Sequence, residues 1–290
     1  MEPLENDLIL TGRHVGSLIG PRRRDCNKGD NGRGLMIAGA PGMTGAAVMS
    51  AAAALRGGVG LLKVISTQAG VEALRALPEA MTVSIQSNRW EDCARQLVEP
   101  LLKEATAVCF GPGFGREKAA ENLLCWVLEA KKPTVVDADG LFALAQIKDK
   151  SSILHNKVVL TPHFGEMARL TGLPIEKIKE QQAEIALEYA QRWGCTVLLK
   201  GTQSVIAAPN GRYAWNRTGN PGLAKGGSGD VLSGIVLAML CQGLSPFDGA
   251  CAGAYLLGTS ADEALELLKE RMLLARDVTD AIERTISHTL

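Results

Sequence analysis

The sequence has no excess of charge of either sign. Its 290 residues carry 31 acidic and 31 basic side chains, so electrostatics gives no reason to expect a nucleic acid or an anionic membrane as a partner. No apolar run is long and unbroken enough to span a bilayer, and the acidic N-terminus lacks a stretch of the signal-peptide type. These absences favour a cytoplasmic protein that binds neither nucleic acid nor membrane.

The cysteines form no recognisable metal or redox motif. Seven are present, without a C-x-x-C pair and without a histidine at zinc spacing. Several stand in apolar runs such as residues 107–110, where cysteine packs as a small hydrophobe. The sequence therefore predicts no cysteine metal site, and it fits a reducing compartment.

Two common nucleotide-binding motifs are also missing. Residues 39–45 (GAPGMTG) lack the G-x-G-x-x-G spacing of a dinucleotide fingerprint. Lys200 precedes Gly201, and the spacing of a P-loop is absent there. Neither motif can therefore support a nucleotide site in this chain.

The pattern of hydrophobic runs predicts an α/β fold with a mainly parallel sheet covered on both faces. After a polar lead-in expected to be irregular over residues 1–25 and on to about residue 33, short β-branched runs alternate with helical stretches. Predicted strands cover residues 35–38, 61–65, 107–110, 134–137, 158–160 and 196–199, and residues 204–208 and 213–215 form a predicted antiparallel hairpin. Predicted helices cover residues 46–55, 91–103, 116–130, 176–193, 246–269 and 277–289, with one more after the glycine-rich loop. No linker or repeat divides residues 1–290, so we expect a single domain.

The most informative segment is residues 218–230, TGNPGLAKGGSGD, which runs directly into an apolar helix. Glycine allows sharp bends and a close approach of the backbone to a ligand, and the free N–H groups of a first helical turn favour an anion. Asp230 would repel phosphate unless it accepts a proton from the group that attacks that phosphate. An N-cap role for Asp230 is the simpler alternative, but the length and polarity of the loop favour a phosphoryl-transfer site.

Polar or glycine-bearing loops follow five of the predicted strands. They comprise residues 39–45, 111–115, 137–139, 161–166 and 200–204. Because ligands of open α/β sheets bind beyond the carboxyl ends of the strands, we expect these loops to line one cleft. Asp137 and Asp139 fit either helix caps or a water-mediated metal–phosphate site. His163 fits either a ligand contact or a structural histidine, and Lys200 needs an anionic partner or solvent.

Together these residues resemble the ribokinase-like superfamily, and within it the stand-alone bacterial branch of ADP- or ATP-dependent (S)-NAD(P)H-hydrate dehydratases. The resemblance covers about residues 25–285. Residues 218–230 mark the superfamily, while residues 37–47 combined with 161–167 mark the branch. The other matching stretches are residues 28–32, 111–113, 136–140, 199–204 and 274–280. The resemblance implies a ribokinase-like three-layer α/β/α fold.

The resemblance also implies roles for individual residues. Asp230 would deprotonate the substrate hydroxyl, and the amides of Gly227, Ser228 and Gly229 would stabilise the phosphoryl group. Ala46, Gly113, His163 and Asp230 would bind the hydrated nicotinamide nucleotide. Lys200, Gly201, Thr202, Gln203, Ser204 and Gly229 would bind ADP or ATP, the co-substrate, which acts with Mg²⁺ and without a direct metal ligand from the protein.

The implied activity is the repair of NADH or NADPH that has added water across a ring double bond. Phosphorylation of the added hydroxyl and loss of phosphate restore the cofactor. The family resemblance also implies a homo-oligomer, a tetramer, and a separate epimerase that interconverts the two hydrate epimers. The donor (ADP or ATP) and the preferred hydrate (NADH or NADPH) stay open.

The chain departs from the usual residues of the family at three positions. Asn27 stands where the family has His, Phe164 where it has Pro, and Arg217 where it has Pro. None of the three carries an assigned role. The main alternative is a kinase of the same superfamily that acts on a hydroxymethylpyrimidine- or hydroxyethylthiazole-type vitamin precursor, because it would share Asp230 and the anion loop. Residues 39–47 and 161–166 favour the dehydratase.

Overall fold

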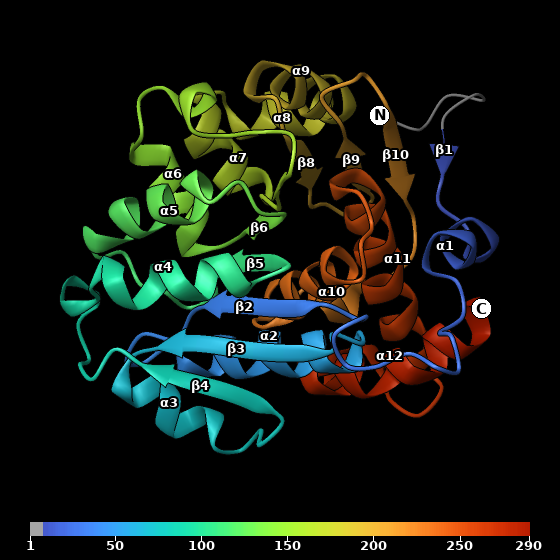
Figure 1. Ribbon diagram of the computed structural model, residues 1–290. Coiled ribbons are helices and arrows are strands. Elements are labelled where there is room, and N and C mark those ends of the chain that lie inside the picture. Colours follow the sequence, from blue (N-terminus) through green and yellow to red (C-terminus); the bar gives the residue numbers. More distant parts are fainter. Residues whose placement is uncertain (1–7) are drawn as a thin grey trace.

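The computed structural model describes residues 8–290, and the strands of this part of the chain form one ten-stranded sheet (Figure 1). The order across the sheet is β1-β10-β9-β8-β7-β6-β5-β2-β3-β4. Strands β2 to β8 run parallel to one another, whereas β9 is antiparallel to both β8 and β10. The strands are β1 (Leu8–Ile9), β2 (Arg33–Ile37), β3 (Leu61–Ser66), β4 (Ala80–Ser84), β5 (Ala107–Phe110), β6 (Thr134–Val136), β7 (Val158–Leu160), β8 (Thr196–Leu199), β9 (Ser204–Ala207) and β10 (Tyr213–Asn216).

Helices cover both faces of this sheet, which gives three layers (Figure 1). The helices are α1 (Gly12–Ile19), α2 (Thr44–Arg56), α3 (Gln68–Leu74), α4 (Arg95–Glu104), α5 (Ala119–Glu129), α6 (Asp139–Gln146), α7 (Phe164–Thr171), α8 (Ile175–Glu180), α9 (Gln182–Trp193), α10 (Ser228–Cys241), α11 (Pro246–Ala264) and α12 (Ala275–Thr289). Four short 3₁₀ turns join them in the described chain: Trp90–Asp92, Lys150–Ser152, Pro221–Leu223 and Glu270–Met272.

The alternation of side chains along the strands produces two separate hydrophobic cores. In β2, Met36 packs into the core formed with α2, α10 and α11, whereas Leu35 and Ile37 pack into the core formed with α4 to α9. Successive residues of a strand point to opposite faces, so a strand with helices on both sides must be apolar throughout. This is why these strands read as unbroken hydrophobic runs.

The predicted α/β fold with a mainly parallel sheet is confirmed. All the predicted strands are present, and β9 and β10 form the predicted antiparallel hairpin. The predicted helix over residues 176–193 is two helices, because Gln181 leaves the helical conformation with φ −118° and ψ 43°. The helix predicted over 246–269 ends at Ala264. The prediction missed α3, α6, α7 and β4.

The prediction of an irregular lead-in is wrong for residues 8–19, whereas residues 20–32 contain no helix or strand; its first seven residues lie outside the described part. Leu8 and Ile9 pair in parallel with Ala214 and Trp215 of β10. Helix α1 follows, capped by the Thr11 hydroxyl, which accepts a hydrogen bond from the His14 N–H at 3.3 Å. A two-residue strand leaves almost no periodic signal in a sequence, and its pairing depends on a partner about 200 residues away. No helix of residues 8–290 has the length and apolar character needed to cross a membrane.

Candidate active site

The five loops identified in the sequence lie side by side at one edge of the sheet. They follow β8, β7, β6, β5 and β2, which are consecutive in the sheet order. Because these strands are parallel, their carboxyl ends meet at the same edge. Asp137 follows the central strand of the five, β6. The five strand ends therefore lie in a row with Asp137 in the middle, between the loop of Lys200 and that of Gly113. The prediction that all five loops line one cleft holds only in part, because the cavity at this edge is lined by residues of the loops after β7 and β8 and not by those of the other three.

Helix α10 begins at the glycine-rich loop and carries Asp230 in its first turn. The N-cap is Gly227, whose φ of 99° lies in the left-handed region that favours glycine. The alternative that Asp230 caps the helix is therefore wrong. The Ser50 hydroxyl donates a 2.8 Å hydrogen bond to the backbone carbonyl of Asp230, which ties this turn to α2. Within residues 8–290 no group donates a hydrogen bond to the Asp230 carboxylate.

Asp137 and Lys200 form an ion pair beneath this helix start. The Asp137 side chain is 2% exposed, and its Oδ1 lies 2.8 Å from Lys200 Nζ. Its Oδ2 accepts a 2.6 Å hydrogen bond from the Ser233 hydroxyl of α10. Burial raises the pKa of Asp137, but Lys200 and then Ser233 outweigh it, so the pKa lies below its ordinary value. Asp137 is therefore a permanent negative charge at neutral pH.

The charge of Asp137 acts on Asp230 across a short distance. A Cβ added to Gly229 would lie 3.5 Å from Lys200 Nζ and 3.6 Å from Asp137 Oδ2, so the first turn of α10 stands directly against the ion pair. Burial, and then the negative charge of Asp137, raise the pKa of Asp230 to about 7, although Lys200 partly opposes this. A carboxylate with a pKa near neutrality and no internal partner is suited to accept a proton from a ligand.

Glu166 and His163 form the next part of the site. His163 is the N-cap of α7, and its Nδ1 accepts hydrogen bonds from the N–H groups of Gly165 (2.9 Å) and Glu166 (3.2 Å). A neutral His163 ring therefore carries its proton on Nε2 and acts there as a donor. Glu166 Oε2 lies 3.8 Å from Lys200 Nζ, and burial raises the pKa of Glu166 although Lys200 opposes it. His163 thus has a structural role through Nδ1, as the N-cap of α7, and offers a donor at the site through Nε2.

A cavity of about 660 Å³ opens beside Lys200 and the start of α10. Lys200, Gly201, Thr202 and Ser204 line one side, and Ser228 and Gly229 contribute the helix start. The remaining wall comes mainly from residues 216–225 and from α11. Of the described residues, no Asp or Glu stands on this wall. A cavity of this volume suits a ligand of nucleotide size, and its lysines and helix start favour an anion.

The loop that forms this wall is anchored to the C-terminal helices at two points. The Asp262 carboxylate accepts hydrogen bonds from the Gly219 N–H (2.8 Å) and the Asn220 side-chain amide (2.9 Å). The Lys225 ammonium donates to the carbonyls of Arg271 (2.7 Å) and Leu273 (2.8 Å). These four hydrogen bonds attach the loop to the segment that runs from α11 to the start of α12.

Ala46 and Gly113 meet on the other side of Asp137. Gly113 has φ 53°, and a Cβ there would collide with the Met43 carbonyl and lie 2.9 Å from Ala46 Cβ. The Gly113 carbonyl also accepts a 2.6 Å hydrogen bond from the Ala40 N–H. The loops after β2 and β5 are thus locked together, and this contact requires glycine.

The predicted site residues therefore fall into two groups. Lys200, Gly201, Thr202, Ser204, Ser228 and Gly229 line the cavity, and His163 lines it too rather than joining Ala46 and Gly113. Gln203 does not line the cavity, and its buried Oε1 has no hydrogen-bond partner among the described residues. Asp137 and Asp139 are not helix caps, because the N-cap of α6 is Ala138. Asp139 Oδ2 instead accepts a 2.8 Å hydrogen bond from the Gly115 N–H.

Three residues of the site were not assigned from the sequence. Ser233 had a visible signal, since it is a polar residue one helical turn after Asp230 in an apolar helix. Lys225 also had a signal in the sequence, because it is the single cation in the glycine-rich loop. Asp262 had no such signal, because its hydrogen-bond partners lie more than 40 residues earlier in the chain.

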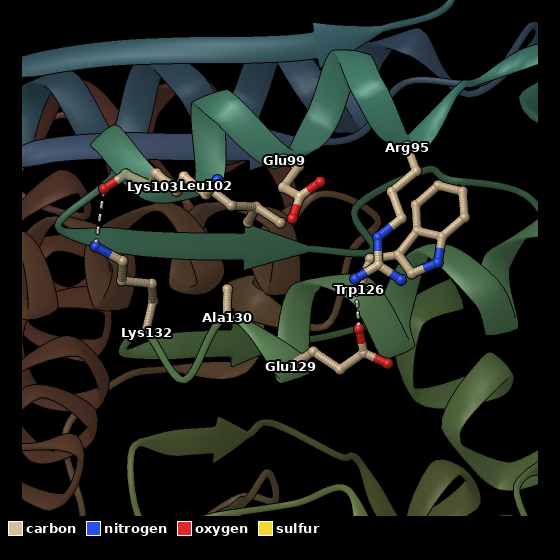
Figure 2. A pocket seen from close by; sticks show the side chains of 8 residues that line it. All are labelled: Arg95, Glu99, Leu102, Lys103, Trp126, Glu129, Ala130 and Lys132. Carbon is tan, nitrogen blue, oxygen red and sulfur yellow. Dashed lines mark hydrogen bonds and ion pairs between the residues drawn. The ribbon is translucent and has the colours of Figure 1, made fainter.

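A separate groove of about 270 Å³ lies between α4 and α5, away from these loops (Figure 2). Figure 2 shows that three of its charged side chains have partners: Arg95 pairs with Glu129 at 2.8 Å, and Lys132 Nζ donates to the Lys103 carbonyl at 3.1 Å. None of the strand-end residues lines it. The groove carries no comparable chemistry.

Two known proteins are similar in sequence to nearly the whole of this chain. The ADP-dependent (S)-NAD(P)H-hydrate dehydratase of Bacillus subtilis is 34% identical over 94% of this chain and 96% of its own length. The bifunctional NAD(P)H-hydrate repair enzyme of Moorella thermoacetica is 41% identical over 95% of this chain and 53% of its own length. The chain thus spans about half the length of the bifunctional relatives that it matches.

Solved structures confirm the ribokinase-like fold. The Bacillus subtilis ADP/ATP-dependent NAD(P)H-hydrate dehydratase, co-crystallised with ATP and Mg²⁺, superposes with a TM-score of 0.86 at 30% identity, covering 99% of this chain and 100% of that one. A ribokinase-like superfamily protein of Enterococcus faecalis gives 0.87 at 27% identity, covering 100% and 98%. A hydroxyethylthiazole kinase of Pyrococcus horikoshii gives 0.58 at 17% identity over 87% of each chain, a likeness of fold alone.

The family model for NAD(P)H-hydrate dehydratases matches residues 35–284, which include every loop of the site described above. That match favours the dehydratase over the vitamin-precursor kinase. The chain belongs to the NAD(P)H-hydrate dehydratase family.

Proposed function

We propose that this protein removes water from the S epimer of hydrated NADH or NADPH and uses ADP or ATP to do so. Asp230 accepts the proton of the added hydroxyl while the hydroxyl oxygen attacks the terminal phosphorus of the nucleotide. AMP is the leaving group when ADP is the donor. The carbon–oxygen bond to phosphate then breaks, a proton leaves the neighbouring carbon, and the ring double bond returns. The products are NAD(P)H, free phosphate and the shortened nucleotide.

The observation that carries this proposal is the unpartnered carboxylate of Asp230 at the start of α10. Its pKa of about 7 matches proton transfer at neutral pH. The helix start, with Ser228 and Gly229, faces the cavity and offers N–H groups to the phosphoryl group in transfer. Base and phosphate site thus belong to the same helical turn.

The two groups of loop residues suit two ligands that meet at Asp230. The cavity lined by Lys200, Gly201, Thr202 and Ser204 suits the adenine nucleotide, and His163 is a further donor on its wall. The surface of Ala46 and Gly113 suits the hydrated nicotinamide. Residues 8–290 contain no group of three or more Asp, Glu, His or Cys side chains that could hold a metal ion. Mg²⁺ arriving on the phosphates with most of its waters needs no such group.

The deciding experiment mixes the protein with Mg²⁺, chemically hydrated NADH or NADPH, and either ADP or ATP, and follows the near-ultraviolet absorbance of the reduced nicotinamide. Recovery that depends on a nucleotide, with release of free phosphate, is the expected result. A stable phosphorylated product from a vitamin precursor, without recovery, would instead support the kinase.

The homo-oligomer, the cytoplasmic location and a separate epimerase stay predictions of the family resemblance.

The rate of dehydration is expected to fall as the pH drops below about 7. Asp230 is protonated below its pKa of about 7 and then cannot accept the hydroxyl proton. A pH profile of kcat/KM for the hydrate, measured at saturating ADP, checks this. An activity that stays level from pH 7 down to pH 5 would exclude Asp230 as the base, because about 99% of such a carboxyl is protonated two units below its pKa.

Replacing Asp262 by Ala is expected to raise the KM for the nucleotide about tenfold and to leave the KM for the hydrate nearly unchanged. The substitution removes the two hydrogen bonds that hold Gly219 and Asn220, and a bond to a charged group contributes about 1.5–3 kcal/mol. Glu266→Ala, at an exposed position nearby, is the matched control. An equal change in both KM values would argue against a specific effect on the nucleotide wall.

A further inference from the structure

The cavity assigned to the nucleotide has two lysines on its wall, and their charges are not equivalent. Lys200 faces Asp137 at 2.8 Å and Glu166 at 3.8 Å, so its positive charge is already balanced by buried carboxylates. Lys225 contacts two neutral carbonyl oxygens, of Arg271 and Leu273. No carboxylate in the described part of the chain lies within ion-pair distance of Lys225. The uncompensated charge of the cavity therefore belongs to Lys225.

Two backbone carbonyls anchor the ammonium group of Lys225. An ammonium group has three N–H donors, and the two carbonyls use two of them. The third remains for a ligand, and Lys225 does not have to leave its anchors to use it. The loop on which it stands is held at its other end by Asp262, which bonds Gly219 and Asn220. A charge held in place in this way loses little side-chain entropy when an anion arrives.

We propose that Lys225 is a phosphate-binding residue of this cavity and that it selects nucleoside phosphates over nucleosides. The inference rests on the proposed function, since it takes the adenine nucleotide as the ligand of the cavity. Lys200 then keeps its place between Asp137 and Glu166, and Lys225 supplies the net attraction for the anion. The wall has no Asp or Glu that would oppose this.

The test compares the binding of ADP, AMP and adenosine by calorimetry in the wild type and in Lys225→Met, Lys225→Arg and Lys269→Met. Lys269 is exposed, does not line the cavity, and controls for the loss of one positive charge. We expect Lys225→Met to weaken ADP binding at least tenfold, as for a lost charge-assisted bond, with adenosine binding unchanged. Lys225→Arg and Lys269→Met should bind ADP within about threefold of the wild type.

Two results would overturn the proposal. If Lys225→Met weakened ADP and adenosine equally, Lys225 would be only an anchor of the loop. If ADP binding did not change at all, the cation that meets the phosphates would be another group. A wild-type protein that binds ADP as expected but fails to restore NAD(P)H would contradict the proposed function and leave the role of Lys225 intact.

Discussion

Replacing Asp230 by Asn is expected to lower kcat for dehydration by about 10²- to 10⁴-fold, the range of a positioned general base. The amide has nearly the same shape but cannot take the hydroxyl proton. The carboxylate makes no internal hydrogen bond that the amide would lose, so ADP should bind within a few-fold of the wild-type affinity. Asp280→Asn, the same chemical change at an exposed position of α12, is the control for activity.

The same substitution should increase stability at alkaline pH. Folding raises the pKa of Asp230 from 3.8 to about 7, so between these values the folded state binds more protons than the unfolded state. Stability then falls as the pH rises through this window, and above it the wild type carries the full cost of the buried charge. Asp230→Asn removes that cost. Urea unfolding at pH 8 measures it, and a variant that is both inactive and less stable would point to misfolding instead.

The opposite effects on activity and stability would identify Asp230 as a functional group. Burial and the negative charge of Asp137 both oppose ionisation of the Asp230 carboxyl. The ionised carboxylate therefore destabilises the folded state, and for the same reason it accepts a proton readily. Residues selected for packing do not show this combination. A kinase with the same base would give the same two results, so product analysis with hydrated NAD(P)H is still needed to separate the two activities.

The sequence predicts the sheet and the site loops well because both depend on local patterns. Apolar β-branched runs mark buried parallel strands, and glycine and polar residues at their ends mark the edge where ligands bind. Asp230 and Lys200 could be selected in this way, and so could residues 39–45 and 111–115. The prediction fails where local pattern is weak, as at β1, or where a helix is interrupted without Gly or Pro, as at Gln181.

The electrostatics of the site could not be predicted, because it depends on distances between residues that are far apart in the sequence. Asp137 and Ser233 are 96 positions apart and Asp137 and Lys200 are 63 apart, yet each pair forms a short hydrogen bond. The need of Lys200 for an anionic partner was predictable, but the identity of that partner was not.

The surroundings of Phe164, which stands where the family usually has Pro, could not be predicted either. Its ring would lie 2.8 Å from a Cβ added to Gly201, so it packs on the loop that lines the cavity.

Replacing Asp137 by Asn is expected to destabilise the protein by about 3 kcal/mol, the lower end of the cost of breaking a buried ion pair. The variant keeps the volume of the side chain but leaves the Lys200 ammonium without its nearest counter-charge. Glu166 remains at 3.8 Å and the Lys200 side chain is 21% exposed, so a larger loss is not expected. Urea unfolding at pH 7 measures the difference, and Asp280→Asn at an exposed position of α12 is the control.

The pH dependence of this loss distinguishes the ion pair from simple packing. Lys200 holds the pKa of Asp137 below its ordinary value of 3.8, so the unfolded state binds the proton first as the pH falls. The stabilisation by the ion pair is therefore fully present at pH values well above 3.8, the pKa of the carboxyl in the unfolded state. It disappears as the pH falls through the lower pKa of the folded state. The wild type and Asp137→Asn should consequently differ most in stability at neutral pH and converge in acid.

The pKa of Asp230 should respond to the same substitution, because loss of the Asp137 charge removes one of the two main causes that raise it. The acid limb of the activity profile of Asp137→Asn is then expected to move to lower pH, and an unmoved limb would show that burial alone sets the pKa of the base.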